Sequence, residues 1–154
     1  MISQDFKEFI VSLNENDVEY LIVGGYAVAI YGHPRYTKDL DVWLSPTQAN
    51  ITKLLKALSD FGFESTQLKV EDFLNEDNVI QLGYPPNRID LLTAIDGVQF
   101  SSSFADRKII QLQEIELPVI SLSHLIQNKL SAGRLQDLAD AEKLSALQQE
   151  PKEE

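Results

Sequence analysis

Residues 39–44 read Asp-Leu-Asp-Val-Trp-Leu, and they constrain the fold more than any other stretch. Side chains alternate between the two faces of a strand, so Asp39 and Asp41 would share one face and Leu40 and Val42 the other. Two carboxylates this close repel each other unless water or a cation lies between them. Oxygen ligands of this kind suit Mg²⁺ or Mn²⁺. The alternative is a solvated acidic pair at a strand edge, since the chain has 24 acidic residues.

A pair of glycines follows the preceding apolar run. Residues 20–23, Tyr-Leu-Ile-Val, are strand-forming, and Gly24 and Gly25 interrupt them. Residues 26–31 then predict a short helix. A strand, two glycines and a helix bring backbone N–H groups to one place, and glycine lets a ligand approach the backbone closely. The pattern predicts a phosphate-binding turn, with a purely steric use of glycine as the alternative.

A third aspartate, Asp90, lies inside the strand-like run 88–92. The apolar run 79–82 precedes it, and Tyr-Pro-Pro-Asn at 84–87 predicts a hairpin connection between the two. An unpaired carboxylate in a central strand is unfavourable. We therefore expect a ligand or a cation beside Asp90, unless its strand lies at an edge of the sheet.

These motifs together resemble a known fold. Gly24-Gly25-(x9)-Arg35-x-Thr37-x-Asp39-Leu40-Asp41, followed by Asp90 on a later strand, is similar to the nucleotidyltransferase fold of the DNA polymerase beta superfamily. More narrowly, the chain resembles small bacterial nucleotidyltransferase-like proteins related to abortive-infection toxins and minimal nucleotidyltransferases. Residues 120–140 resemble the end of those proteins, so the likeness covers most of the chain.

The resemblance implies roles for five residues. Gly24 and Gly25 would contact the nucleotide phosphates, and Asp39, Asp41 and Asp90 would hold two divalent metal ions. One departure is Gly25, which stands where a serine is common in the superfamily. A serine hydroxyl therefore cannot help to hold the triphosphate, although the backbone still could.

The remaining patterns predict a mixed α/β (α+β) fold, in which helices pack on a small mixed β-sheet and further helices follow at the C-terminus. An amphipathic helix is predicted near residues 6–13, and the segments 108–112 and 116–120 are predicted to be extended. Ser45 is predicted to cap a helix with Pro46 at its first position. We expect one nucleotidyltransferase-like domain at 1–148, with its helical end at about 121–148, and a polar tail at 149–154.

Composition excludes several classes of protein. The net charge of -11 argues against a broad nucleic-acid-binding surface. Without cysteine there are no disulfides or thiolate metal sites. No stretch is long and apolar enough to cross a membrane, and the first residues lack the features of a signal peptide. We expect a cytoplasmic protein with no membrane association.

Basic side chains near the motifs are candidates to neutralise phosphates: Arg35, Lys38 and Lys129. Lys129 falls within the apolar stripe of a predicted helix. It could pair with Asp137 or Asp140, or it could face a triphosphate, and the sequence leaves both open.

The sequence therefore predicts a metal-dependent nucleotidyltransferase that moves a nucleoside monophosphate from a nucleoside triphosphate to an acceptor hydroxyl. Two alternatives remain: a nucleotide-binding module with little turnover, or one component of a toxin–antitoxin pair acting through a protein partner. The acceptor, which could be a protein or an RNA, is not identified by the sequence.

Overall fold

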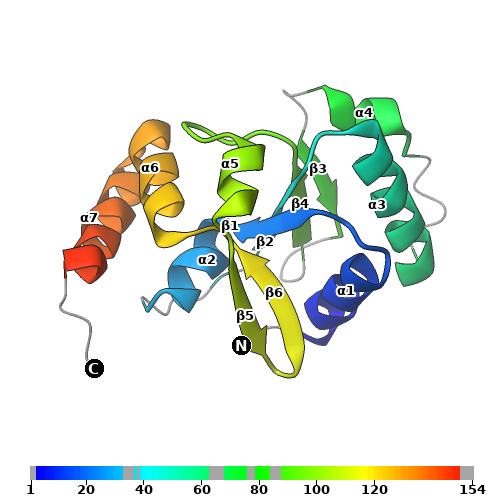
Figure 1. Ribbon diagram of the computed structural model, residues 1–154, viewed down its shortest axis with the longest axis horizontal. Helices are drawn as coiled ribbons and strands as arrows, with labels where there is room; N and C mark the ends of the chain where they lie inside the picture. The colour runs from blue at the N-terminus through cyan, green and yellow to red at the C-terminus, as the bar shows by residue number, and fades with distance from the viewer. Residues whose placement is uncertain are drawn as a thin grey trace.

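The computed structural model describes residues 3–32, 37, 39–62, 68–75, 79–83 and 88–149 (Figure 1). The elements are α1 Gln4–Glu15, β1 Tyr20–Val23, α2 Gly24–Ile30, β2 Asp39–Leu44, α3 Gln48–Phe61, α4 Val70–Leu74, β3 Val79–Leu82, β4 Arg88–Leu92, α5 Phe100–Ala105, β5 Lys108–Leu112, β6 Ile115–Val119, α6 Leu122–Ala132 and α7 Leu135–Gln149. Helices packed on a mixed sheet confirm the predicted fold class.

The sheet has six strands in the order β3-β4-β2-β1-β6-β5. The pairs β2–β4 and β1–β6 are parallel, and the other three neighbouring pairs are antiparallel. The strands β4, β2 and β1 therefore lie in the interior of the sheet. Asp90 is on an interior strand, so the edge-strand explanation of its carboxylate does not apply.

One face of the sheet is the main apolar face. Leu40, Val42 and Leu44 of β2 are almost completely buried. The helices α1 and α3 lie side by side next to the sheet (Figure 1), and the Ser12 hydroxyl donates to the Ala57 carbonyl over 2.7 Å. The Tyr20 hydroxyl ties β1 to α1 by donating to Asn14 Oδ1 over 2.7 Å. The period-two pattern of β2 thus sends its apolar side chains to this face and its aspartates to the other.

The start of α3 differs from the prediction. Thr47, not Ser45, is the N-cap, and its hydroxyl accepts a hydrogen bond from the Asn50 amide over 3.2 Å. Ser45 instead extends the ladder, because its amide donates to the Glu19 carbonyl over 3.2 Å. Asn50 Nδ2 donates to the Ser45 carbonyl over 3.0 Å. These contacts keep the backbone extended beyond β2, so the helix begins later than Pro46.

The predicted C-terminal helices are present, and they form a hairpin. The helix α6 ends at Gly133, whose φ of 74° is a left-handed conformation suited to glycine. The helix α7 then packs along α6 (Figure 1). The predicted tail begins at residue 149, but α7 extends through Gln149. Residues 150–154 lie outside the described residues.

Candidate active site

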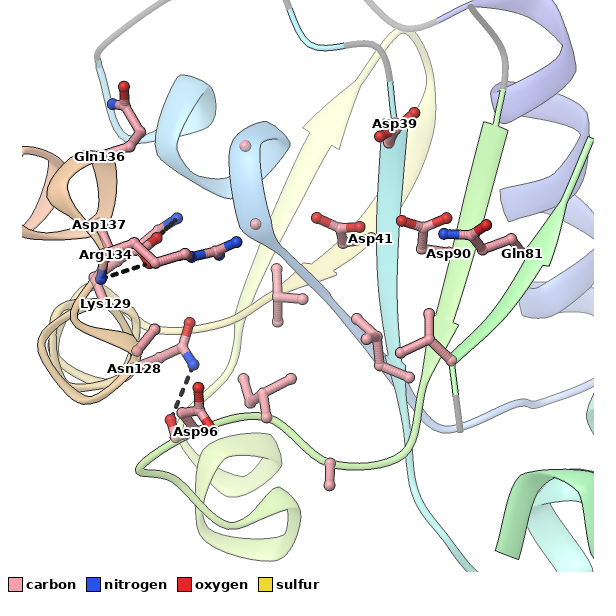
Figure 2. Close-up of a pocket in the computed structure, with 18 residues that line it drawn as sticks. Asp39, Asp41, Gln81, Asp90, Asp96, Asn128, Lys129, Arg134, Gln136 and Asp137 are labelled. Carbon is pink, nitrogen blue, oxygen red and sulfur yellow. Dashed lines mark hydrogen bonds and ion pairs between the residues drawn. The ribbon is translucent and has the colours of Figure 1, made fainter. Parts of the chain in front are cut away.

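The three aspartates singled out in the sequence lie on one face of the sheet. In the parallel β2–β4 register Asp41 pairs with Asp90, and Asp39 pairs with Arg88. Residues paired in register share a face, as do residues two apart in one strand. The three carboxylates therefore line one cleft of about 690 Å³, where Figure 2 shows them beside one another.

The glycine pair at the start of α2 forms the adjacent wall of this cleft. Gly24 and Gly25 line it, and Val23 pairs with Asp41 in the antiparallel β1–β2 register. Gly24 has a φ of 67°, and a Cβ atom at this position would overlap Asp41 Oδ2. The glycine pair does not form a separate turn, because α2 begins at Gly24 itself. Only a residue without a side chain fits between the backbone and the Asp41 carboxylate.

Burial and two neighbouring carboxylates raise the proton affinity of Asp41. Burial raises the pKa of Asp41 to about 7, and the neighbouring charges of Asp90 and Asp39 add to this effect. Lys129 acts in the opposite direction. Asp39 Oδ1 is buried and accepts no hydrogen bond from the described residues. The site therefore has an excess of negative charge and an unused oxygen acceptor.

Arg88 partly compensates this charge. Its Nη2 donates to Asp39 Oδ2 over 2.7 Å, and its Nε donates to Asp90 Oδ1 over 3.0 Å. A third contact of 3.2 Å joins Nη2 to Asp90 Oδ2. The hydrogen bond to Asp90 is the main cause that raises the pKa of the Arg88 guanidinium, and the negative charges of Asp90 and Asp39 raise it further. Arg88 thus bridges two of the three carboxylates.

Basic side chains from α6 and the start of α7 face the acidic strands across the cleft. Lys129 is buried and forms ion pairs with Asp137 Oδ1 over 3.2 Å and Asp140 Oδ2 over 3.4 Å. Arg134 Nε binds Asp137 Oδ2 over 2.8 Å. Burial opposes the ionisation of Asp137, but the hydrogen bonds from Arg134 and Lys129 outweigh it and lower the pKa of this carboxyl.

Lys129 and Arg134 differ in their exposure to the cleft. The Lys129 side chain is 10% exposed, whereas that of Arg134 is 81% exposed. Both line the cleft, and Figure 2 shows them on the side opposite Asp41. The pairing of Lys129 with Asp137 and Asp140, one of its two predicted alternatives, is present. Arg134 is held by Asp137 and is the more accessible cation of this wall.

The remaining wall carries less charge. Val79 and Gln81 of β3 and Leu92 of β4 line it. Asn128 Nδ2 donates to the Asp96 carbonyl over 2.9 Å, which ties the segment after β4 to α6 (Figure 2). Gln127 Nε2 donates to the neighbouring Gly97 carbonyl over 2.7 Å. These bonds fix the position of Asp96, a fourth acid at the cleft.

The predicted site is only partly complete in the described structure. Asp39, Asp41, Asp90, Gly24, Gly25 and Lys129 line the cleft, whereas Arg35 and Lys38 lie outside the described residues. The sequence interpretation did not place Asp96 at the site and did not pair Arg88 with the aspartates. Arg88 precedes Asp90 by two residues, so strand periodicity put it on the acidic face, but its pairing with Asp39 depends on the β2–β4 register.

Comparison with known proteins identifies the family. A family model described as "Nucleotidyltransferase of unknown function (DUF6036)" matches residues 1–149. The chain belongs to this family. The family description assigns nucleotidyl transfer as the type of reaction, and the predicted resemblance is confirmed.

Solved structures share its fold. A protein from Thermotoga maritima assigned as a nucleotidyltransferase is 16% identical, with a TM-score of 0.62 over 95% of this chain and 96% of that one. The lincosamide antibiotic adenylyltransferase LnuA, with lincomycin bound, is 12% identical, with a TM-score of 0.56 over 96% and 98%. A nucleotidyltransferase-like antigen from Paracoccidioides brasiliensis is 14% identical, with a TM-score of 0.54 over 93% and 74%. No curated protein matches the chain.

Within the described residues, no helix has the length and apolarity needed to span a membrane. Among these same residues, no group of three or more histidine, aspartate or glutamate side chains could hold a metal ion as the side chains stand.

The basic wall of this nucleotidyltransferase yields a stability prediction. Lys129→Met should lower the free energy of unfolding by about 3 kcal/mol, because it leaves the buried Asp137 and Asp140 carboxylates without a shared cation. Arg134→Met should lower it by less than about 1 kcal/mol, since the side chain is largely exposed. Urea denaturation of both variants measures the difference. Equal losses, or a larger loss for Arg134→Met, would show that Lys129 does not support the α6–α7 hairpin.

The crowding of the carboxylates yields a pH-dependent prediction. The pKa of Asp41 is about 7 in the folded protein, whereas the ordinary value of an aspartate is 3.8. The folded state therefore holds the proton more tightly, and stability falls as the pH rises from about 4 to about 7. Asp41→Asn removes this loss. Because one pKa unit corresponds to about 1.4 kcal/mol, its stability gain without metal should be about 1–3 kcal/mol larger at pH 8 than at pH 5.

Asp60→Asn is the matched control for this measurement. It makes the same charge change on the exposed part of α3, where hydrogen bonds from Asn16 and Lys56 lower the pKa of Asp60. This control should show no gain in stability at pH 8. A gain for Asp41→Asn that is equal at the two pH values would contradict a raised Asp41 pKa.

Proposed function

We propose that this nucleotidyltransferase transfers a nucleoside monophosphate from a nucleoside triphosphate to an acceptor hydroxyl, with Mg²⁺ or Mn²⁺ as its cofactor. The observation that supports the proposal is the β2–β4 register. It brings Asp39, Asp41 and Asp90 onto one face, against the Gly24 backbone. Mutual repulsion makes this arrangement unfavourable unless a cation relieves it.

The donor set fits a hard divalent cation. Mg²⁺ prefers carboxylate oxygens, water and substrate phosphates, and the candidate donors are all carboxylates. Asp39 Oδ1 supplies a buried acceptor with no partner among the described residues. Asp41 Oδ2 occupies the space that a Cβ of residue 24 would fill, so its carboxylate is held beside the backbone. Asp39 and Asp41 would hold both ions, and Asp90 would complete the coordination of one.

A bound divalent pair would neutralise the developing charge on the attacking and leaving oxygens of the displacement. The acceptor oxygen forms a bond to the α-phosphorus, and the bond from that phosphorus to the pyrophosphate oxygen breaks. The acceptor's proton passes to a carboxylate oxygen, a role that we assign to Asp90. The three aspartates would thus bind the metal ions, and Asp90 would also take up the proton.

The glycine pair and the basic wall of the cleft are suited to contact the phosphates of the substrate. Gly24 and Gly25 leave backbone accessible for the phosphates. Across from them, Arg134 is the accessible cation, and we assign it contact with the β- and γ-phosphates. Lys129 contributes its positive charge from a buried position. The proposed roles of Arg35 and Lys38 in neutralising phosphates stay predictions.

The test is a labelling experiment. Wild-type protein, Asp41→Asn and Asp60→Asn are each incubated with Mg²⁺, cell extract and one of the four α-³²P-labelled ribonucleoside triphosphates. Wild type and Asp60→Asn should label one class of acceptor and release pyrophosphate. The labelling rate of Asp41→Asn should be lower by at least about 100-fold, the size of effect expected when stabilisation of the reacting charges is lost. The chemical nature of the labelled material identifies the acceptor as protein, RNA or small molecule.

Binding measurements separate the enzyme from a nucleotide-binding module. Saturable triphosphate binding with no label transferred from any nucleotide would contradict the enzymatic proposal and support binding with little turnover. Arg134→Met should weaken triphosphate binding more than monophosphate binding, because the lost charge acts on the terminal phosphates. Labelling that is equal in wild type and Asp41→Asn would exclude the aspartates as the reaction centre.

A further inference from the structure

Arg88 has a place in this site that the proposed chemistry does not use. It is opposite Asp39 in the β2–β4 register and two residues before Asp90, so its side chain leaves the sheet between these two carboxylates. Three donor–acceptor contacts of 2.7, 3.0 and 3.2 Å fix the guanidinium on them. Among the ion pairs of the described residues, none joins Arg88 to Asp41.

The guanidinium already binds three of the four carboxylate oxygens that Asp39 and Asp90 could offer to a divalent ion. Asp39 Oδ2 and both oxygens of Asp90 accept hydrogen bonds from Arg88. Charge-assisted hydrogen bonds of this geometry are among the stronger ones in proteins. An ion coordinated by Asp39 and Asp90 must therefore break part of this network.

Arg88 is able to leave these carboxylates. Its side chain is 28% exposed, so the guanidinium can reach water or a bound anion by a change of rotamers. Lys129 and Arg134 differ in this respect, because their ion partners Asp137 and Asp140 lie on α7 and not on the acidic strands. Arg88 is thus the one described cation that an incoming metal ion would displace.

We propose that Arg88 is a built-in counter-cation, which pairs Asp39 with Asp90 in the metal-free protein and competes with the divalent ion for them. The inference rests on the proposed metal site. It has a functional consequence: the ion binds weakly alone and more tightly together with a triphosphate, whose phosphates supply further oxygens to the ion and an anion to the displaced guanidinium. Arg88 is in this sense a positioning residue that selects for the metal–nucleotide complex.

The test measures Mn²⁺ affinity without nucleotide, by the electron paramagnetic resonance signal of the free ion. Arg88→Gln should bind Mn²⁺ about tenfold more tightly than wild type, because the ion no longer displaces charge-assisted hydrogen bonds. Arg134→Gln is the matched control, since it removes one positive charge from the same cleft but none of these bonds. Its affinity should stay within about threefold of wild type, the change expected from a screened charge. Arg88→Lys should fall between wild type and Arg88→Gln.

A second measurement uses the wild-type protein and does not depend on the folding of Arg88→Gln. The ¹⁵N Nε–H resonance of Arg88, assigned by its loss in Arg88→Lys, should shift as Mg²⁺ is added, with the same midpoint as metal binding. The resonance of Arg134 should shift less. An Arg88 resonance that does not change at saturating Mg²⁺ would overturn the displacement.

The outcomes distinguish this inference from the proposed function. Mn²⁺ binding to wild type with equal or weaker affinity in Arg88→Gln overturns the competition and leaves the metal site intact. Equal tightening in Arg88→Gln and Arg134→Gln shows only a general effect of charge and also overturns it. No Mn²⁺ binding to either protein, with or without a triphosphate, overturns the metal site and the inference together.

Discussion

The parallel pairing of β2 with β4 is the constraint on which the site depends. It sets Asp41 directly beside Asp90 and Asp39 beside Arg88, on interior strands whose opposite face is packed with apolar side chains. A shift of either strand by one residue would turn the carboxylates toward α1 and α3. The apolar face therefore fixes the register, and the register forces three acids together. The charge this leaves must be compensated by Arg88, by a proton or by a metal ion.

The charged side chains of the cleft are divided between its two sides. Acidic strands form one side, and a basic wall with Lys129 and Arg134 forms the other. The two cations are fixed in different ways, since Lys129 is enclosed by two aspartates of α7 and Arg134 is held by only one of them. The apolar and amide side chains of β3 complete the cleft without strong charge. The net charge of -11 is therefore not evenly matched at the cleft, where Lys129 and Arg134 face the acidic strands.

Much of this arrangement could be predicted from the sequence, because it depends on local periodicity. Strand alternation placed Asp39 and Asp41 on one face, and the cost of an unpaired carboxylate drew attention to Asp90. The pairing of Arg88 with Asp39 joins residues 49 apart, so no local pattern indicates it. The predicted start of α3 was wrong because the Asn50 side chain donates a hydrogen bond to the Ser45 carbonyl, a contact that capping preferences do not include. For Lys129, helical periodicity predicted a buried position. The choice between the α7 aspartates and a triphosphate as its partner could be made only once the packing of α6 on α7 was known.

The most direct test of this account is crystallography of the protein with Mn²⁺ and a non-hydrolysable nucleoside triphosphate, using data collected at the manganese absorption edge. The account predicts anomalous density in the space between Asp39, Asp41 and Asp90, with the phosphates against Gly24 and Gly25. It also predicts an Arg88 guanidinium that has left Asp39. Manganese bound only elsewhere, with Arg88 still bridging Asp39 and Asp90 while the nucleotide is in place, would contradict it.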